Sequence, residues 1–387
     1  VDDVKVWSNF YQSSQGVRDY MYKEAVGNET NLVAYYKLDE TSGTTANDSQ
    51  SSSTYDGTLT NMAGSEWTTS SAFFGPKNCL DFDGLDANVW CPSISPEVTS
   101  GSIEFWVNLD VIPADNARLI SRHSEYGYDE IYLLNNDGRI FTGGSFVVGD
   151  DLQSTNPLPT DVWTHVAITA DGSGSKLYIN GIVDDTGGAA AWNFTNFRFG
   201  GQYSANIALY EGIDGMMDEV RLWNVVRTES EIQENMYKSL VGDESGLVAY
   251  YNLDNVYGAV AQSYPVEAND GSIGGGATWV TSTAFNTWLD TDDTDWATAS
   301  NWSNGVPGST DNIGIYNYTN SPASSADLSI NNLYLGTDAN FNLTGSLVIN
   351  GNAFLNSALN ITSGKYMTVD GELSIANINK ASNLTIA

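Results

Sequence analysis

Residues 217–254, MDEVRLWNVVRTESEIQENMYKSLVGDESGLVAYYNLD, decide how the rest of this chain is interpreted. The alternation at 220–223 predicts a strand, and the apolar run at 247–253 predicts a second strand. Between them, Thr228 is followed three residues later by Glu231, which is the capping-box pattern of a helix N-terminus. The segment therefore predicts a strand, a short helix and a strand.

The same segment occurs again at the start of the chain, as VDDVKVWSNFYQSSQGVRDYMYKEAVGNETNLVAYYKLD. Trp7 matches Trp223, and LVAYY at 32–36 recurs at 247–251. The match continues through the Asp-Gly pairs at 56–57 and 270–271 to residues 67–73 and 279–285. Two copies on either side of a central body predict a tandem array. We therefore expect residues 1–27 to be the C-terminal end of a preceding unit.

Composition excludes several classes of function. Among 387 residues, 48 are acidic and 15 are basic, so the formal net charge is −33. This charge argues against binding to nucleic-acid phosphates or to an anionic membrane surface, both of which need clustered Lys and Arg. It favours solubility and the binding of divalent cations. The sequence has no apolar run of the roughly 18–20 residues that a membrane span requires, so we expect no membrane insertion.

Residues 28–245 are predicted to form one all-β domain. Short alternating strands recur there, and Asn180-Gly181 is a strong hairpin signal. Many short strands with a single helix predict a two-sheet sandwich or jelly roll. Residues 246–285 repeat the opening of this domain but lack the body that should follow. We expect them to add strands to the preceding domain or to act as a connector.

From Trp288 onward the composition changes. Short L-x-[ILV] units recur between Asn- and Gly-rich corners, at 333–335, 347–349, 359–361, 367–369, 373–375 and 384–386. Short strands at such spacing predict the rungs of a β-solenoid over 286–387, although a small β-sandwich is an alternative. We expect further rungs to follow this segment in its parent chain.

Several motifs between residues 28 and 245 are shared with one family. They are LDE at 38–40, DSQSSSTYDGTL at 48–59, LDFDGLDANV at 80–89, WTHVAIT at 163–169, LYING at 177–181 and GMMDEVRLWN at 215–224. In this order they resemble the laminin-G-like, concanavalin-A-like jelly rolls of secreted bacterial proteins. The segment WATASNWSNGVP at 296–307 resembles the opening of the solenoid modules of large surface adhesins.

The resemblance implies an exported, non-catalytic adhesin segment at the cell surface, acting in adhesion or gliding motility. Its partners would be a glycan or another surface ligand and the neighbouring domains of the same chain. Two alternatives remain: a carbohydrate-binding appendage of a secreted polysaccharide-degrading enzyme, and a structural spacer of a surface filament. A glycosidase on this fold is not expected, because the chain lacks the E-x-D-x-x-E strand pattern of such enzymes.

The resemblance also implies a structural calcium site. Asp48 and Asp56 stand in the Ser-rich loop that borders such a site in the family, and Asp218 is the Asp of its D-E-V strand. In the second copy Gln262 replaces Asp48 while Asp270 replaces Asp56, which is what loss of a metal site would look like. The alternative is that Asp48 and Asp56 are ordinary turn residues that cap their own backbone.

Cys79 and Cys91 bracket a predicted hairpin that turns near 84–87. In that register they face each other, and the extracellular character of the resembling proteins favours a disulfide. The alternative is two small buried apolar residues.

Carbohydrate binding relies on exposed aromatic faces with polar groups beside them. The loop aromatics are the candidates, although most aromatics of a sandwich are core residues or cross-strand partners. These candidates are Tyr126, Tyr128, Trp192, Tyr203 and Tyr210.

Overall fold

The computed structural model divides the chain into two compact units, Val1–Gly75 and Pro76–Ala387. The residues it describes are 4–8, 27, 29–38, 40, 42–50, 55–65, 67, 78–124, 127–143, 151–189, 194–201, 203–204, 209–255, 258–289, 293–316, 320–362 and 364–375. The side chains of residues 123–129, 203–204, 209–210 and 267 lie outside that description.

The first unit is a small β-structure. Strands β1 (Val4–Trp7) and β2 (Leu32–Tyr36) pair antiparallel, and β3 (Thr45–Ala46) pairs with β4 (Gly57–Thr58). Leu32 and Tyr35 are buried, with Trp7 packed against them. The first copy of the repeat therefore forms a strand pair with its own apolar cluster.

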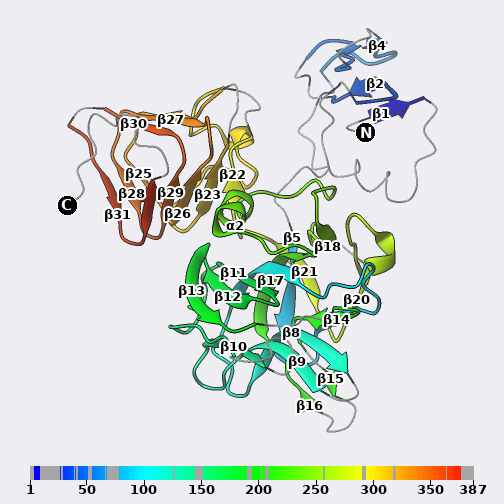
Figure 1. Cartoon of the computed structure of the whole chain (residues 1–387). Coiled ribbons are helices and arrows are strands. Elements are labelled where there is room, and N and C mark those ends of the chain that lie inside the picture. The colour runs from blue at the N-terminus through cyan, green and yellow to red at the C-terminus, as the bar shows by residue number, and fades with distance from the viewer. Residues whose placement is uncertain are drawn as a thin grey trace. The chain divides into compact units, whose positions relative to one another are not determined.

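The second unit begins with a sandwich of two antiparallel sheets (Figure 1). One sheet has eight strands in the order β13-β12-β11-β7-β17-β5-β21, with β18 also paired to β17. Its strands are β5 (Asn78–Asp83), β7 (Gly101–Leu109), β11 (Thr164–Asp171), β12 (Gly174–Ile179), β13 (Ile182–Gly187), β17 (Asp214–Trp223), β18 (Leu247–Tyr251) and β21 (Thr278–Thr281).

The other sheet has seven strands in the order β10-β9-β8-β14-β6-β20-β19. They are β6 (Asn88–Cys91), β8 (Ala117–Ser124), β9 (Gly127–Leu133), β10 (Ile140–Gly143), β14 (Phe197–Phe199), β19 (Val260–Ala261) and β20 (Gly271–Gly274). A separate hairpin joins β15 (Tyr203–Ser204) to β16 (Leu209–Tyr210). Between the two sheets lies one apolar core, which confirms the predicted two-sheet sandwich.

Strand alternation decides which side chains enter this core. On β7, Ile103, Phe105 and Val107 join the core between the sheets, whereas Glu104 and Trp106 point to the opposite face. Helix α2 (Glu229–Asn235) follows β17 and begins with the predicted capping box. Near its C-terminal end, the main-chain oxygen of Met236 accepts a hydrogen bond from the Trp106 indole at 2.9 Å, so this segment packs on the sheet's outer face.

The second copy of the repeat completes the sandwich. β18 pairs with β17, β20 with β6 and β21 with β5, so residues 246–285 do add strands to the domain that precedes them. The pairs Trp223↔Leu247 and Trp7↔Leu32 occupy matching positions, each after a register shift of the same kind. Each copy of LVAYY thus pairs with the DEV-type strand that precedes it in sequence.

The predicted domain boundaries at 28 and 245 therefore differ from the structure. Leu32–Tyr36 belongs to the first unit and pairs with β1, while the place beside β17 is taken by Leu247–Tyr251. The reason is that the two LVAYY copies are identical, so local sequence cannot say which of them a distant strand edge will select. The sandwich of the second unit runs from β5 at Asn78 to β21 at Thr281.

A parallel β-solenoid follows, as predicted (Figure 1). One face is formed by β22 (Asn286–Thr287), β23 (Asn312–Ile315), β26 (Asn332–Leu335), β29 (Ala353–Leu355) and β32 (Leu373–Ile375). The second is formed by β24 (Ala323–Ser324), β27 (Asn340–Leu343) and β30 (Ala358–Ile361), and the third by β25 (Leu328–Ile330), β28 (Leu347–Ile349) and β31 (Met367–Val369). On the first face Leu333, Ala353 and Leu373 are consecutive partners, so one turn is 20 residues.

Asparagines at one corner hold successive turns together. The Asn312 side chain donates to the main-chain oxygen of Ala284, and the Asn332 side chain donates to Asn312 Oδ1 at 2.6 Å. The side-chain oxygens of Asn332 and Asn352 then accept hydrogen bonds from the main-chain N–H groups of Asn352 and Glu372, respectively. Stacked side-chain amides of this kind satisfy buried polar groups at this corner in every turn, which explains why asparagine recurs between the strands of the sequence.

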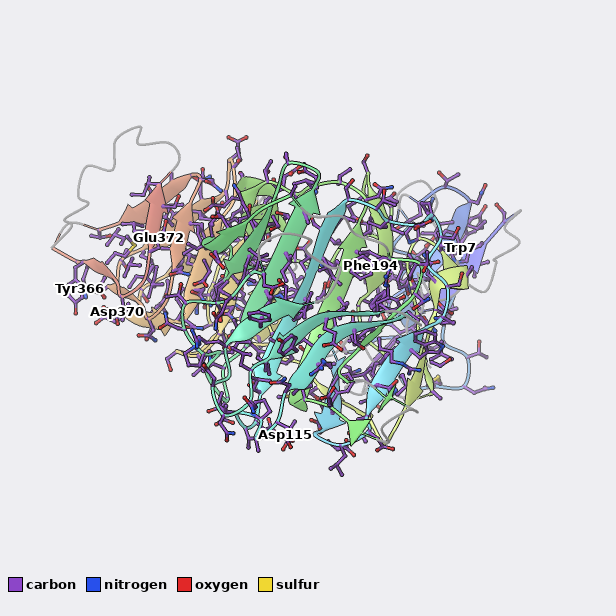
Figure 2. The ribbon with its side chains drawn as sticks, turned by 60° about the horizontal axis from the view of Figure 1, so that its bottom comes forward. Trp7, Asp115, Phe194, Tyr366, Asp370 and Glu372 are labelled. Carbon is purple, nitrogen blue, oxygen red and sulfur yellow. The ribbon has the colours of Figure 1, made fainter. Side chains whose placement is uncertain are left out.

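The tryptophan-rich opening belongs to the apolar core of the solenoid. Trp288, Trp296 and Trp302 are buried, and Trp296 stacks on Phe341 with ring centroids 5.0 Å apart. At the other end Tyr366 is exposed, and Figure 2 labels it on the solenoid with Asp370 and Glu372. Among the described residues, no helix has the length and apolar character that crossing a membrane requires.

Candidate ligand-binding face of the seven-stranded sheet

The outer face of the seven-stranded sheet carries a row of polar and aromatic side chains. Register places Glu130 on β9 opposite Ser121 on β8, Ser121 opposite Arg198 on β14, and Arg198 opposite Trp90 on β6. The row continues to Ser272 on β20. The residues that alternate with these face the core, so the row lies on the side away from it.

One end of the face is built around Arg118. Its guanidinium lies 2.8 Å from Glu130 and 3.0 Å from Glu211, and 4.9 Å from the ring centre of Tyr132. Tyr132 in turn lies 5.4 Å from Phe141 of β10, and both rings are half-buried. Burial raises the pKa of the Tyr132 hydroxyl above its usual value. This end therefore presents two neighbouring rings beside a neutral hydroxyl.

The other end is built around Arg198. Its guanidinium carbon lies 4.3 Å from the ring centre of Trp90, and its Nη1 donates to Asn88 Oδ1 at 2.7 Å. Trp90, Asn88 and Arg198 are half-buried, and Ser272 beside them is exposed. Aromatic rings flanked by amide, hydroxyl and guanidinium groups are the chemistry that a sugar requires.

The structure does not test the five aromatic residues predicted to bind sugar. Tyr126 and Trp192 lie outside the described residues. Tyr128 is on β9, and Tyr203 pairs with Tyr210 in the β15–β16 hairpin, but their side chains also lie outside the description. These five remain predictions.

Sequence reasoning missed the aromatics that the structure does place on this face, Trp90, Tyr132 and Phe141. The sequence signal that could have identified them is strand alternation, which places an aromatic residue between two core residues on the outer face of the sheet. Trp90 stands between the core residues Val89 and Cys91, and Tyr132 stands between two further core residues, Ile131 and Leu133.

The predicted metal ligands are divided between the two units. In the first unit, Asp48 Oδ1 accepts the N–H of Tyr35 at 2.9 Å and Asp48 Oδ2 accepts that of Tyr55 at 3.1 Å, while Asp56 Oδ1 accepts the N–H of Asp48 at 2.9 Å. Asp48 thus holds main-chain groups of β2 and of its own loop, and Asp56 holds one of the loop, as the turn interpretation expects for loop carboxylates.

In the second unit, Asp218 is buried and accepts hydrogen bonds from its neighbour's N–H and from Ser282 Oγ at 2.6 Å. Within the described part of the chain, no group of three or more His, Cys, Asp or Glu side chains could hold a metal ion. The structure therefore does not unite Asp48, Asp56 and Asp218 in one unit, and calcium stays a prediction.

The predicted Cys79–Cys91 disulfide is wrong. Cys79 is on β5 in the eight-stranded sheet and Cys91 is on β6 in the seven-stranded sheet, so the expected hairpin between them does not form. Cys91 faces the core between the sheets, while Cys79 packs with Trp106 on the outer side. Both thiols are unpaired and buried, and burial raises both pKa values, that of Cys91 to about 12.

A second polar cluster lies on the outer face of the eight-stranded sheet, but it is closed to ligands. Glu104 Oε1 accepts the indole N–H of Trp223 at 2.7 Å, and its Oε2 lies 3.3 Å from His165 Nε2. Burial lowers the pKa of His165 and alone would raise that of Glu104, but His165 and the charge of Arg221 lower the Glu104 pKa overall. The side chains of Glu104, His165, Arg221 and Trp223 are all at most 1% exposed. The cluster therefore holds the sheet to its cover, which is helix α2 and the residues that follow it.

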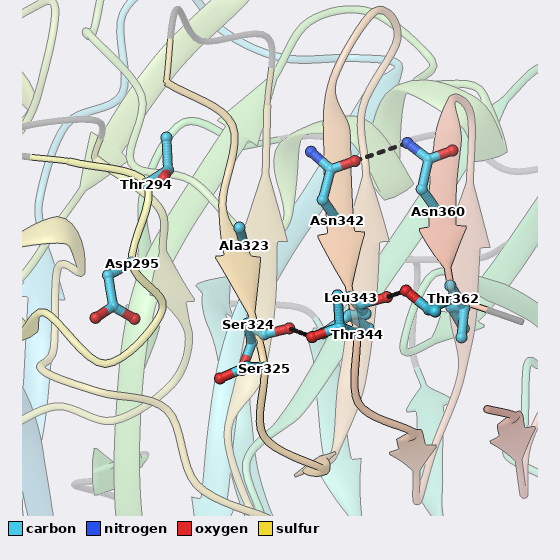
Figure 3. Close-up of a pocket in the computed structure, with 11 residues that line it drawn as sticks. Thr294, Asp295, Ala323, Ser324, Ser325, Asn342, Leu343, Thr344, Asn360 and Thr362 are labelled. Atoms are coloured by element: carbon cyan, nitrogen blue, oxygen red, sulfur yellow. Dashed lines mark hydrogen bonds between the residues drawn. The ribbon is translucent and has the colours of Figure 1, made fainter. Parts of the chain in front are cut away.

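Figure 3 shows a shallow groove of about 560 Å³ on the solenoid face formed by β24, β27 and β30. It is lined by Thr294, Asp295, Ala323, Ser324, Ser325, Asn342, Leu343, Thr344, Asn360, Ile361 and Thr362. The polar groups bond between turns: Asn360 Nδ2 donates to Asn342 Oδ1 at 2.9 Å, and Thr362 Oγ1 donates to the Leu343 main-chain oxygen at 3.1 Å. These bonds stabilise the stack, and the groove presents no aromatic ring.

Comparison with known proteins agrees with this fold. Residues 83–233 match the laminin-G family model described as the concanavalin A-like lectin/glucanases superfamily. Among curated proteins, none matches this chain.

Three solved structures illustrate the range of similar folds. A putative carbohydrate-binding protein from Bacteroides ovatus is 21% identical, with a TM-score of 0.45, and the match covers 59% of this chain and 66% of that one. A pentraxin from Limulus polyphemus is 12% identical, with a TM-score of 0.39 and coverage of 54% and 97%. Domain 4 of an extracellular arabinanase from Geobacillus stearothermophilus, in complex with arabinotriose, is 17% identical, with a TM-score of 0.33 and coverage of 54% and 84%.

Proposed function

We propose, from the laminin-G-like domain at residues 83–233, that this chain is a non-catalytic, extracellular glycan-binding segment of a cell-surface adhesin. In this proposal the sandwich binds the glycan through the outer face of its seven-stranded sheet. The solenoid extends the array, and neighbouring domains of the same long chain flank it. Gliding motility and adhesion to another surface are the processes that such an array would serve.

The observation that carries the proposal is the row of half-buried rings and polar groups on that face. Tyr132 and Phe141 form one neighbouring pair of rings, and their strand positions are fixed by the sheet. A rigid sheet presents such rings without the entropy cost of ordering a loop when ligand binds. The face is therefore suited to an extended saccharide lying across the strands.

The carboxylates of the same face favour binding over hydrolysis. Glu130 and Glu211 both pair with Arg118, so a guanidinium already engages both carboxylates. A glycosidase instead needs one carboxyl group that stays protonated as the acid and a second that faces the sugar across an open cleft. The other buried carboxylates among the described residues, Glu104, Asp218 and Glu219, lie on the eight-stranded sheet and are at most 1% exposed.

The proposal keeps calcium as a structural ion of the Asp48–Asp56 loop in the first unit. Its support is the resemblance of that loop to calcium-binding loops and the strongly acidic composition. Melting with and without a chelator tests this ion separately from glycan binding.

The function is tested by applying the whole chain to an array of microbial and plant glycans. We expect binding to at least one extended polysaccharide, and we expect Tyr132→Ala and Phe141→Ala to weaken that binding about 10-fold each, because each removes one ring contact. Tyr366→Ala is the matched control, since this exposed tyrosine is on the solenoid. Absence of binding to every glycan would support the alternative of a structural spacer.

A further inference from the structure

The arginines of this chain differ in how their charge is neutralised. Arg118 pairs with Glu130, Arg139 with Asp137, and Arg221 with Glu219, at 2.7–2.8 Å in each case. Arg198 stands apart: among the described residues its contacts are one hydrogen bond to Asn88 and the face of Trp90. In a chain with 48 acidic residues, a guanidinium that has no carboxylate partner within the described ranges is an exception that requires an explanation.

Trp90 leaves the hydrogen-bonding edges of Arg198 available. A guanidinium carries five N–H donors in its plane, and stacking on an indole uses its faces and not its edges. One donor is bound to Asn88, which fixes the rotation of the group. Burial lowers the pKa of Arg198, and no carboxylate among the described residues opposes that effect. The group has thus lost water without gaining a counter-charge from the part of the chain that the structure describes.

We infer that Arg198 is the receptor for the carboxylate of an acidic sugar, so that the outer face of the seven-stranded sheet recognises a polysaccharide containing uronic acid. This inference rests on the proposed glycan-binding function and names its ligand class. The in-plane N–H groups match a carboxylate in two-point geometry. Ser272, exposed on the next strand opposite Trp90, is placed to bond a sugar hydroxyl beside that carboxylate.

The net charge of −33 does not exclude an anionic ligand at this point. At physiological salt, exposed charges are screened beyond about 8 Å, so the groups next to the ligand decide its affinity. The nearest described carboxylate along the row, that of Glu130, is two strands from Arg198 and is paired with Arg118.

The test measures binding of the whole chain, by calorimetry or affinity electrophoresis, to polyuronates and to the same polymers after reduction of their carboxyl groups. We expect a polyuronate to bind at least about 10-fold more tightly than its reduced form, and Arg198→Gln to remove that preference, because a charge-assisted hydrogen bond contributes about 10- to 100-fold in affinity. Arg139→Gln is the matched control, since it removes the same charge from an exposed pair.

Arg198→Lys keeps the charge but loses the planar fork, and we expect it to keep part of the preference. Circular dichroism confirms that each variant is folded. Equal binding of the native and reduced polymers, unaffected by Arg198→Gln, would overturn the inference and leave glycan binding intact. Preference for a sulfated polysaccharide over every polyuronate would also overturn it. Failure to bind any charged or neutral glycan would reject both the inference and the proposed function.

Discussion

Replacing Arg221 with methionine tests how the cover is held on the eight-stranded sheet. Arg221 is 1% exposed, and its Nη2 lies 2.7 Å from both Glu219 Oε2 and the main-chain oxygen of Lys238. Its Nη1 donates to the main-chain oxygen of Asn235 at 3.0 Å, where α2 ends. One side chain therefore links β17 to the segment that follows α2.

The structure predicts a large loss for Arg221→Met. The change leaves Glu219 buried without its cation, and breaking a buried ion pair in this way costs about 3–5 kcal/mol. Arg139→Met is the same chemical change in a pair whose two side chains are each 34% exposed, for which a much smaller loss is expected because water screens the charges. The comparison isolates the contribution of burial.

The assay is urea unfolding of the whole chain, with hydrogen exchange of peptides from β17 and α2 to assign the transition. We expect Arg221→Met to lower the midpoint with little change of slope and to reduce protection in both elements. The double variant Arg221→Met with Glu219→Leu should recover part of the loss, because it removes the unpaired charge. A loss for Arg221→Met no larger than that of Arg139→Met would refute this account of the cluster.

Three further predictions follow from the described residues. Burial lowers the pKa of His165 below its ordinary value of 6.5, so the contribution of the neutral imidazole to stability is complete above that pH and is lost as the pH falls. The pH dependence of the urea midpoint between pH 7 and 5 should therefore flatten in His165→Gln. A midpoint that rises on acidification would contradict this prediction. Thiol titration without reductant should find two reactive cysteines, Cys79 and Cys91, after denaturation and none before, whereas none in either state would mean a disulfide. If calcium occupies the first unit, EDTA should lower the melting temperature of that unit, and Asp48→Ala should abolish the difference. Bound calcium at one hundred times its dissociation constant would stabilise the unit by about 2.7 kcal/mol. Equal destabilisation by Asp48→Ala with and without EDTA would instead assign Asp48 to its main-chain contacts with Tyr35 and Tyr55.

Local patterns were sufficient to predict the elements. Alternation at Ile103–Val107, the capping box at Thr228 and the L-x-[ILV] units each depend on residues that are close in sequence. For the same reason the apolar faces of the sandwich and the solenoid could be predicted, since the face a residue occupies depends on its immediate neighbours.

Pairing between distant segments required the tertiary structure. The sequence alone showed that LVAYY occurs twice and that Cys79 and Cys91 bracket a turn, but not which strand edges would take them. Two identical strands have the same pairing preferences, so only the folded structure shows which of them pairs with a given strand edge. A short turn can likewise connect strands of two different sheets as well as two strands of one sheet. The contact of Arg198 with Trp90, on which the proposed ligand class rests, likewise depends on strands β14 and β6, which are neighbours in the sheet and distant in sequence.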